Sequence, residues 1–170
     1  MGIKTPQSQS QLQSRAREQV QADAAAPITD NGVTSLLLVD DDSVLAGLWQ
    51  TYLQRLGYRV DCCGTVADAE ILLQSNSYQL LIVDLFLREN GRILEEGGVT
   101  LINRVRLNRN TSKTSPPPIA VLAVTGAPAR SAGKFSAVDS IQNLTDGILH
   151  KPVRLEELSL EVRRLVTDTV

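Results

Sequence analysis

Carboxylate, hydroxyl and amino side chains stand directly after four apolar runs of this sequence. In chain order these positions are Asp40-Asp41-Asp42, Asp84, Thr125 with Gly126, and Lys151 with Pro152. Carboxylates gathered at one place repel one another, because like charges ~4 Å apart cost about 4 kcal/mol at an effective dielectric of 20. A hard divalent cation relieves that repulsion, and oxygen ligands without histidine or cysteine suit magnesium. A carboxylate nucleophile, a metal, a lysine and a threonine are together the groups needed for phosphoryl transfer to an aspartate side chain.

The apolar runs before these positions are predicted to be β-strands. Leu36–Val39, Leu80–Val83 and Ile119–Val124 are almost continuously apolar, which is typical of parallel strands buried on both faces. Two shorter strands are expected at Tyr58–Cys63 and Gly147–Lys151. Because the carboxyl ends of parallel strands meet at one edge of the sheet, the polar residues should meet there as well.

Residues with helical spacing separate the strands and predict five helices. The first begins at Asp42 or Ser43 and ends at Gly57, and Thr65 with Asp68 resembles a capping box at the start of the second. The other three are expected around Val99–Val105, around Val138 and Ile141, and at Leu155–Val166. Five strands that alternate with helices predict an α/β fold, a doubly wound five-stranded parallel sheet of the (βα)5 type.

Four short motifs at the strand ends resemble one family. They are Val-Asp-Asp-Asp at 39–42, Val-Asp-Leu at 83–85, Val-Thr-Gly-Ala at 124–127 and His-Lys-Pro-Val at 150–153. In this order they look like the response-regulator receiver domain of two-component signalling, the CheY-like superfamily. The resemblance covers about Ser35 to Val166 and implies the flavodoxin-like strand order 2-1-3-4-5.

The resemblance also implies a role for each motif residue. Asp84 would be the phosphoacceptor and a magnesium ligand. Asp41 would bind Mg²⁺ directly, Asp40 would bind it through water, and the backbone carbonyl of Phe86 would complete the protein ligands. Thr125 and Lys151 would each contact a phosphoryl oxygen. In the family the peptide bond between the residues at Lys151 and Pro152 is cis, which the small X-Pro energy gap permits.

Three features depart from the family pattern. The loop after Asp84 carries about six extra residues, around 88–96, before Gly98 opens the next helix; these determine partner specificity or are a tolerated surface insertion. Ile148 occupies the switch position that is usually aromatic. Phe86 and Ala127 occupy the two positions that tune the lifetime of the phosphorylated state, and both side chains are apolar.

Composition sets the limits around this interpretation. The chain has 170 residues and a formal net charge of −2, so it offers no general attraction to nucleic acid or to an anionic membrane. Residues 1–33 are rich in Gln, Ser and Ala and predict a flexible tail, which leaves 34–170 for the receiver domain. No apolar run is long enough to span a bilayer. The adjacent Cys62 and Cys63 offer no disulfide framework, which favours a reduced, cytoplasmic protein.

The sequence therefore predicts a signalling phosphoacceptor rather than an enzyme. The donor would be a histidine kinase or a histidine phosphotransfer protein. Since the last predicted helix ends close to Val170, output is expected through contacts with another protein or through onward phosphotransfer. One rival is a pseudo-receiver, which binds proteins without being phosphorylated. A second is a haloacid-dehalogenase-like phosphatase with Asp40 and Asp42 as its Asp-x-Asp motif, but the chain ends before the further acidic pair that family needs.

Overall fold

The computed structural model describes residues 33–89, 92–93, 97–108, 119–126 and 141–167. The predicted tail lies outside these ranges except for Val33. The predicted helix around Val138 and Ile141 also falls mostly outside them, as does Ala127. The statements below concern the described residues.

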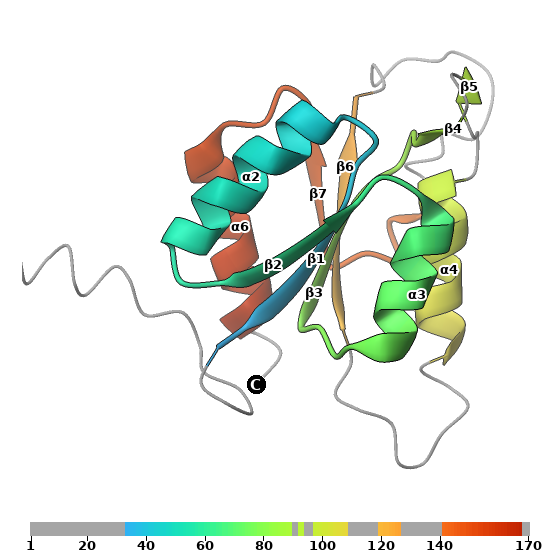
Figure 1. Ribbon diagram of the computed structural model, residues 1–170, viewed down its shortest axis with the longest axis horizontal. Coiled ribbons are helices and arrows are strands. Elements are labelled where there is room, and N and C mark those ends of the chain that lie inside the picture. The colour runs from blue at the N-terminus through green and yellow to red at the C-terminus, as the bar shows by residue number, and fades with distance from the viewer. Residues whose placement is uncertain (1–32, 90–91, 94–96, 109–118, 127–140, 168–170) are drawn as a thin grey trace, which may run out of the picture.

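Five parallel strands form a single sheet in the middle of the molecule (Figure 1). The strands are β1 (Ser35–Val39), β2 (Arg59–Cys63), β3 (Leu80–Asp84), β6 (Ala120–Thr125) and β7 (Gly147–His150). Their order across the sheet is β2-β1-β3-β6-β7. This is the predicted 2-1-3-4-5 order when the five strands are counted along the chain. The doubly wound, flavodoxin-like fold is thus confirmed.

Helices cover both faces of this sheet. The helices are α2 (Ser43–Arg55), α3 (Val66–Ser75), α4 (Gly97–Asn108) and α6 (Leu155–Thr167). Figure 1 shows α2 and α6 on one face, and α3 and α4 on the other. None of the helices in the described ranges has the length and the apolar character needed to cross a bilayer.

The sheet separates two apolar cores, because successive side chains of a strand point to opposite faces. Leu36 and Leu38 of β1 join the core under α2 and α6, whereas Leu37 and Val39 join the core under α3 and α4. Each of these four side chains is at most 1% exposed. Burial on both faces explains why the strand sequence is uniformly apolar rather than alternating.

Local capping fixes where the helices beside the strand ends begin. Asp42 is the N-cap of α2, and its Oδ1 accepts hydrogen bonds from the amides of Val44 at 3.1 Å and Leu45 at 3.0 Å. Of the two possible helix starts that the sequence left open, Asp42 is therefore the cap and Ser43 the first helical residue. At α3 the predicted capping interaction is confirmed: the Thr65 hydroxyl accepts from the Asp68 amide at 3.1 Å and donates to the Asp68 carboxylate at 2.7 Å.

The insertion after Asp84 contains a small antiparallel hairpin. Its strands are β4 (Arg88–Glu89) and β5 (Arg92–Ile93), and they form a separate two-stranded sheet. Figure 1 shows the hairpin at the same end of the molecule as the carboxyl ends of the central strands. The described residues of the insertion, 88–89 and 92–93, therefore lie on the side of the molecule where the polar residues were expected to meet.

Candidate functional site

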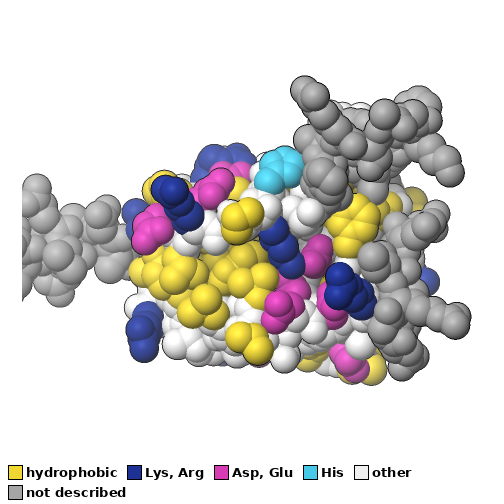
Figure 2. All heavy atoms as spheres, turned by 90° about the horizontal axis from the view of Figure 1, so that it is seen from above, with side chains coloured by type: hydrophobic (Ala, Val, Ile, Leu, Met, Phe, Trp, Pro, Cys, Tyr) yellow, Lys and Arg dark blue, Asp and Glu magenta, His cyan; other side chains and the backbone are white. Residues whose placement is uncertain are grey.

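The predicted polar residues do meet at the carboxyl edge of the sheet. Asp40 directly follows β1 and Lys151 directly follows β7, while Asp84 and Thr125 are the last residues of β3 and β6. The prediction had placed Asp84 and Thr125 one residue beyond their strands. They are included because pairing between β3 and β6 continues to Asp84 and Val124, and pairing between β6 and β7 to Thr125 and His150. Figure 2 looks onto this edge and shows acidic and basic side chains next to one another.

Lys151 joins the two buried carboxylates of this edge. Its Nζ donates to Oδ2 of Asp40 at 2.8 Å and to Oδ2 of Asp84 at 2.5 Å. Asp40 is 3% exposed and Asp84 is 7% exposed. These are charge-assisted hydrogen bonds in a poorly hydrated place, where they are stronger than on the open surface. The lysine thus holds together two groups that would otherwise repel each other.

The second oxygen of each carboxylate is bound by a backbone amide two residues later. Oδ1 of Asp40 accepts from the Asp42 amide at 2.9 Å, and Oδ1 of Asp84 accepts from the Phe86 amide at 2.9 Å. These local bonds restrict rotation of both side chains. As a result, the Oδ2 atoms of Asp40 and Asp84 point toward the shared ammonium group.

Burial and hydrogen bonding have opposite effects on the pKa values of Asp40 and Lys151. Burial raises the pKa of Asp40 above its usual value, although the hydrogen bonds from Lys151 and the Asp42 amide oppose this. Burial by itself lowers the pKa of Lys151, but its hydrogen bonds to Asp40 and Asp84 outweigh burial, and the pKa of Lys151 is raised. Lys151 therefore carries a positive charge at neutral pH, and the site depends on that charge.

The donor atoms at this edge fit a hard divalent cation. Carboxylate oxygens of Asp40, Asp41 and Asp84 lie within 4.8 Å of one another, and Asp41 is the least buried of the three. All donors are carboxylate oxygens, which Mg²⁺ prefers over nitrogen or sulfur. Three carboxylates against one ammonium also leave an excess of negative charge, which a divalent ion would balance. Asp40, Asp41 and Asp84 are therefore the residues able to hold magnesium.

The other residues that the sequence predicted for the site lie at or near the same strand ends, apart from Ala127, which is not described. Thr125 is fully buried, and its backbone carbonyl accepts from the Lys151 amide at 2.8 Å, which fixes the start of the segment after β7. The peptide bond between Lys151 and Pro152 is cis. Phe86 and Ile148 are half-buried and pack against the core under α3 and α4. Ala127 lies outside the described residues.

Gly98, which the sequence indicated only as the glycine that opens α4, contacts the phosphoacceptor candidate. A Cβ atom at Gly98 would lie 2.2 Å from the backbone oxygen of Asp84. Sequence reasoning did not find this contact, since the two residues are separated by the inserted loop. The only signal in the sequence is the Gly-Gly pair at positions 97–98, inside the first turn of a helix, where each glycine costs about 1 kcal/mol relative to alanine.

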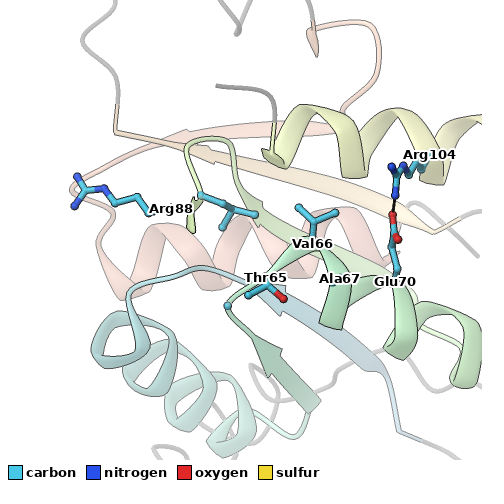
Figure 3. Close-up of a pocket in the computed structure, with 8 residues that line it drawn as sticks. Thr65, Val66, Ala67, Glu70, Arg88 and Arg104 are labelled. Carbon is cyan, nitrogen blue, oxygen red and sulfur yellow. Dashed lines mark hydrogen bonds and ion pairs between the residues drawn. The ribbon is translucent and has the colours of Figure 1, made fainter. Parts of the chain in front are cut away.

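A hollow of about 230 Å³ lies beside this edge, and Gly64, which lines it, is close to the backbone of Asp40 and Asp41. It is lined by the β2–α3 turn, the first turns of α3, residues 87–88 and Arg104 of α4. Figure 3 shows Arg104 paired with Glu70 at one end and the Arg88 side chain pointing away from Thr65 and Val66. Since none of the three clustered carboxylates lines it, we regard the edge with Lys151, and not this hollow, as the chemical site.

Comparison with known proteins agrees with this geometry. The family model described as the response regulator receiver domain matches residues 36–163. The transcriptional regulatory protein PmrA of Pectobacterium parmentieri is 32% identical over 134 residues, which are 77% of this chain and 51% of that protein. The alginate biosynthesis transcriptional regulatory protein AlgB of Pseudomonas putida is 31% identical over 136 residues, or 76% of this chain and 27% of that protein. The chain thus spans about half or less of the length of these relatives.

Solved structures show the same fold. The response regulator receiver domain protein (CheY-like) from Methanospirillum hungatei has a TM-score of 0.65 at 20% identity, with 81% of this chain and 97% of that chain covered. The response regulator protein TrrA from Thermotoga maritima, crystallised in complex with Mg²⁺-BeF, has a TM-score of 0.59 at 21% identity, with 78% and 99% covered.

Proposed function

Since this chain belongs to the response-regulator receiver family of two-component systems, we propose that it accepts a phosphoryl group on Asp84 from a phosphohistidine donor. The observation that carries the proposal is the pair of hydrogen bonds from Lys151 to the buried carboxylates of Asp40 and Asp84. This arrangement places a nucleophilic oxygen and a cation able to bind phosphate at the same point. Receiver domains are phosphoacceptors in signalling rather than enzymes that turn over a substrate.

In the proposed reaction, Oδ2 of Asp84 attacks the phosphorus atom of the donor. An O–P bond forms at Asp84 while the P–N bond of the phosphohistidine breaks, and the imidazole leaves. The hydrogen bond from the Phe86 amide to Oδ1 holds the carboxylate in one orientation during the attack. Lys151, which starts with its Nζ 2.5 Å from Oδ2, transfers a hydrogen bond from Asp84 to a phosphoryl oxygen as that oxygen gains charge.

A magnesium ion held by Asp40, Asp41 and Asp84, with the Phe86 carbonyl as a further ligand, would neutralise charge on the phosphoryl oxygens. Asp41 would be the direct ligand and Asp40 would act through water. We assign to Thr125 a hydrogen bond to a second phosphoryl oxygen. Its support is the position of Thr125 at the end of β6, next to Val124, which pairs with Asp84.

The test uses a small-molecule phosphodonor such as acetyl phosphate with magnesium, and mass spectrometry of the intact protein. Asp84→Asn should abolish the mass gain of one phosphoryl group, because an amide has the same shape but is a poor nucleophile. The matched control is Asp42→Asn, which makes the same exchange at the residue next to Asp41 but outside the clustered carboxylates, and asparagine caps a helix as well as aspartate does. Full labelling of Asp84→Asn at another residue would refute the assignment.

The same assay separates the proposal from its rivals. A pseudo-receiver would stay unmodified in the parent protein, while a phosphatase would consume the donor and lose its activity when Asp40 is replaced. Asp41→Ala should weaken magnesium binding more than Asp40→Ala, because direct ligation contributes more than a water-mediated contact. Equal magnesium affinity in Asp41→Ala and the parent protein, measured by calorimetry, would show that Asp41 is not a direct ligand.

The proposed partner is a histidine kinase or a histidine phosphotransfer protein, and the proposed output is contact with a further protein or onward phosphotransfer. The relatives named above are transcriptional regulatory proteins, but this chain matches only a part of each. We also propose a cytoplasmic location. It is supported by Cys62 and Cys63, which are both free thiols, as is usual in a reducing compartment.

A further inference from the structure

Gly98 in the first turn of α4 lies against the backbone of the phosphoacceptor. A Cβ atom at this position would lie 2.2 Å from the carbonyl oxygen of Asp84 and 2.7 Å from the Cα of Leu85. Both neighbours are backbone atoms, which cannot rotate away as the end of a flexible side chain can. Any residue other than glycine would force α4 and the end of β3 apart by about 1 Å, judged against ordinary atomic packing.

The backbone that Gly98 touches is already held from the other directions. The Leu85 amide donates to the Val124 carbonyl of β6 at 2.9 Å, and the Phe86 amide donates to Oδ1 of Asp84 at 2.9 Å. Leu85 is fully buried, and Leu87 is 1% exposed. The turn Asp84–Phe86 therefore has β6 on one side and Gly98 on another, with the Leu85 side chain anchored in the core. Its position depends on the α4 contact as well as on the sheet.

We propose that Gly98 is a positioning residue for phosphoryl transfer, which sets the Asp84–Phe86 turn by direct backbone contact. The inference rests on the proposed function, in which this turn supplies the nucleophile and the Phe86 carbonyl that would bind the metal. A displacement of about 1 Å at a reacting group commonly costs about 100-fold in rate. Because Gly98 follows the insertion in the sequence, the contact also links the chain after the insertion to Asp84.

Two other glycines provide matched controls. A Cβ atom at Gly147 would also be crowded, 2.4 Å from Oε1 of Glu161 and 3.1 Å from Cδ1 of Leu122, but Gly147 begins β7 at the end of that strand away from Lys151. A Cβ atom at Gly47 in α2 would meet nothing within 4 Å. Gly147→Ala therefore tests crowding against side chains, which can move, away from the site, and Gly47→Ala tests the substitution without crowding.

The experiment compares Gly98→Ala, Gly147→Ala and Gly47→Ala at a temperature where circular dichroism shows each variant folded. Labelling by acetyl phosphate should be slowed about 10–100-fold in Gly98→Ala and unchanged in both controls. Magnesium affinity, measured by calorimetry without any phosphodonor, should fall about 10-fold in Gly98→Ala alone. A Gly98→Ala protein that labels and binds magnesium like the parent would overturn the inference, since α4 would then have moved without disturbing the turn.

A measurement on the unchanged protein keeps the inference testable if Gly98→Ala does not fold. During a magnesium titration followed by NMR, the backbone amide signal of Gly98 should shift together with that of Phe86, while the signal of Gly147 stays in place. A shift of Phe86 without a shift of Gly98 would contradict the proposed coupling. Failure of the proposed function would be recognised by a different result, because the parent protein itself would then not be labelled by acetyl phosphate.

Discussion

Replacing Lys151 by methionine tests whether one ammonium group stabilises the two buried carboxylates. Methionine keeps most of the apolar stem but removes the charge that now lies 2.8 Å from Asp40 and 2.5 Å from Asp84. Asp40 and Asp84 are almost fully buried, whereas the Lys151 side chain is 21% exposed. Removing one partner of a buried pair typically costs 3–5 kcal/mol. Because Lys151 is partly hydrated, we expect the lower end, about 3 kcal/mol of the free energy of unfolding, or roughly 10 °C in the melting temperature.

Magnesium should reverse most of this loss. In the parent protein a bound ion would compete with the Lys151 ammonium for the carboxylates of Asp40 and Asp84, and in Lys151→Met that competition would be absent. The variant should therefore bind magnesium more tightly than the parent. Because magnesium also stabilises the parent, the deficit shrinks only by the ratio of the two dissociation constants, and binding about 100-fold tighter in the variant would recover about 2.7 kcal/mol, close to the expected deficit.

The assay is urea-induced unfolding, carried out with EDTA and with saturating MgCl2. The control is Arg106→Met, which also removes a cation that pairs with an aspartate: Arg106 contacts Asp146 at 2.5 Å and the Leu144 carbonyl at 2.6 Å. Its loss of stability should be the same with and without magnesium, because Asp146 is not part of the clustered carboxylates. If Lys151→Met unfolds like the parent in EDTA, or if its deficit does not depend on magnesium, the electrostatic reasoning is wrong.

Two further outcomes follow from single residues of this site and its neighbourhood. Burial raises the pKa of both Cys62 and Cys63 to about 11, so at pH 8 the native protein should react with iodoacetamide about 100-fold more slowly than the protein unfolded in guanidinium. The native rate should rise as the pH approaches 11, and equal native and unfolded rates at pH 8 would contradict the expected burial. Phe86 and Ala127 offer no polar group to orient a hydrolytic water, so the phosphorylated state should be long-lived, and Phe86→Asn combined with Ala127→Glu should shorten it about 10–100-fold. A decay time course with magnesium present checks this, and an unchanged or slower decay would assign the lifetime to another feature, such as the inserted loop.

The pattern of the sequence determined the fold class and which polar residues meet at the carboxyl edge of the sheet. Leu36–Val39 could be read as a strand buried on both faces because a parallel sheet covered by helices leaves no solvent-facing side. Once the strands were known, Asp40, Asp84 and Lys151 had to converge, since the carboxyl ends of parallel strands share one edge. This reasoning needs only local composition and a rule of topology, so it did not depend on long-range contacts.

Only the tertiary structure decided the contacts between these residues. The sequence did not indicate that Lys151 binds Asp40 as well as Asp84, because that depends on the distances between three separate strand ends. The extension of β3 to Asp84 depended on pairing with β6. An inserted loop separates Gly98 from Asp84 in the sequence. A local sequence pattern does not predict which residue after such an insertion contacts a residue before it. Packing between elements distant in the chain set these positions, while the residue types alone determined the chemistry that they can perform.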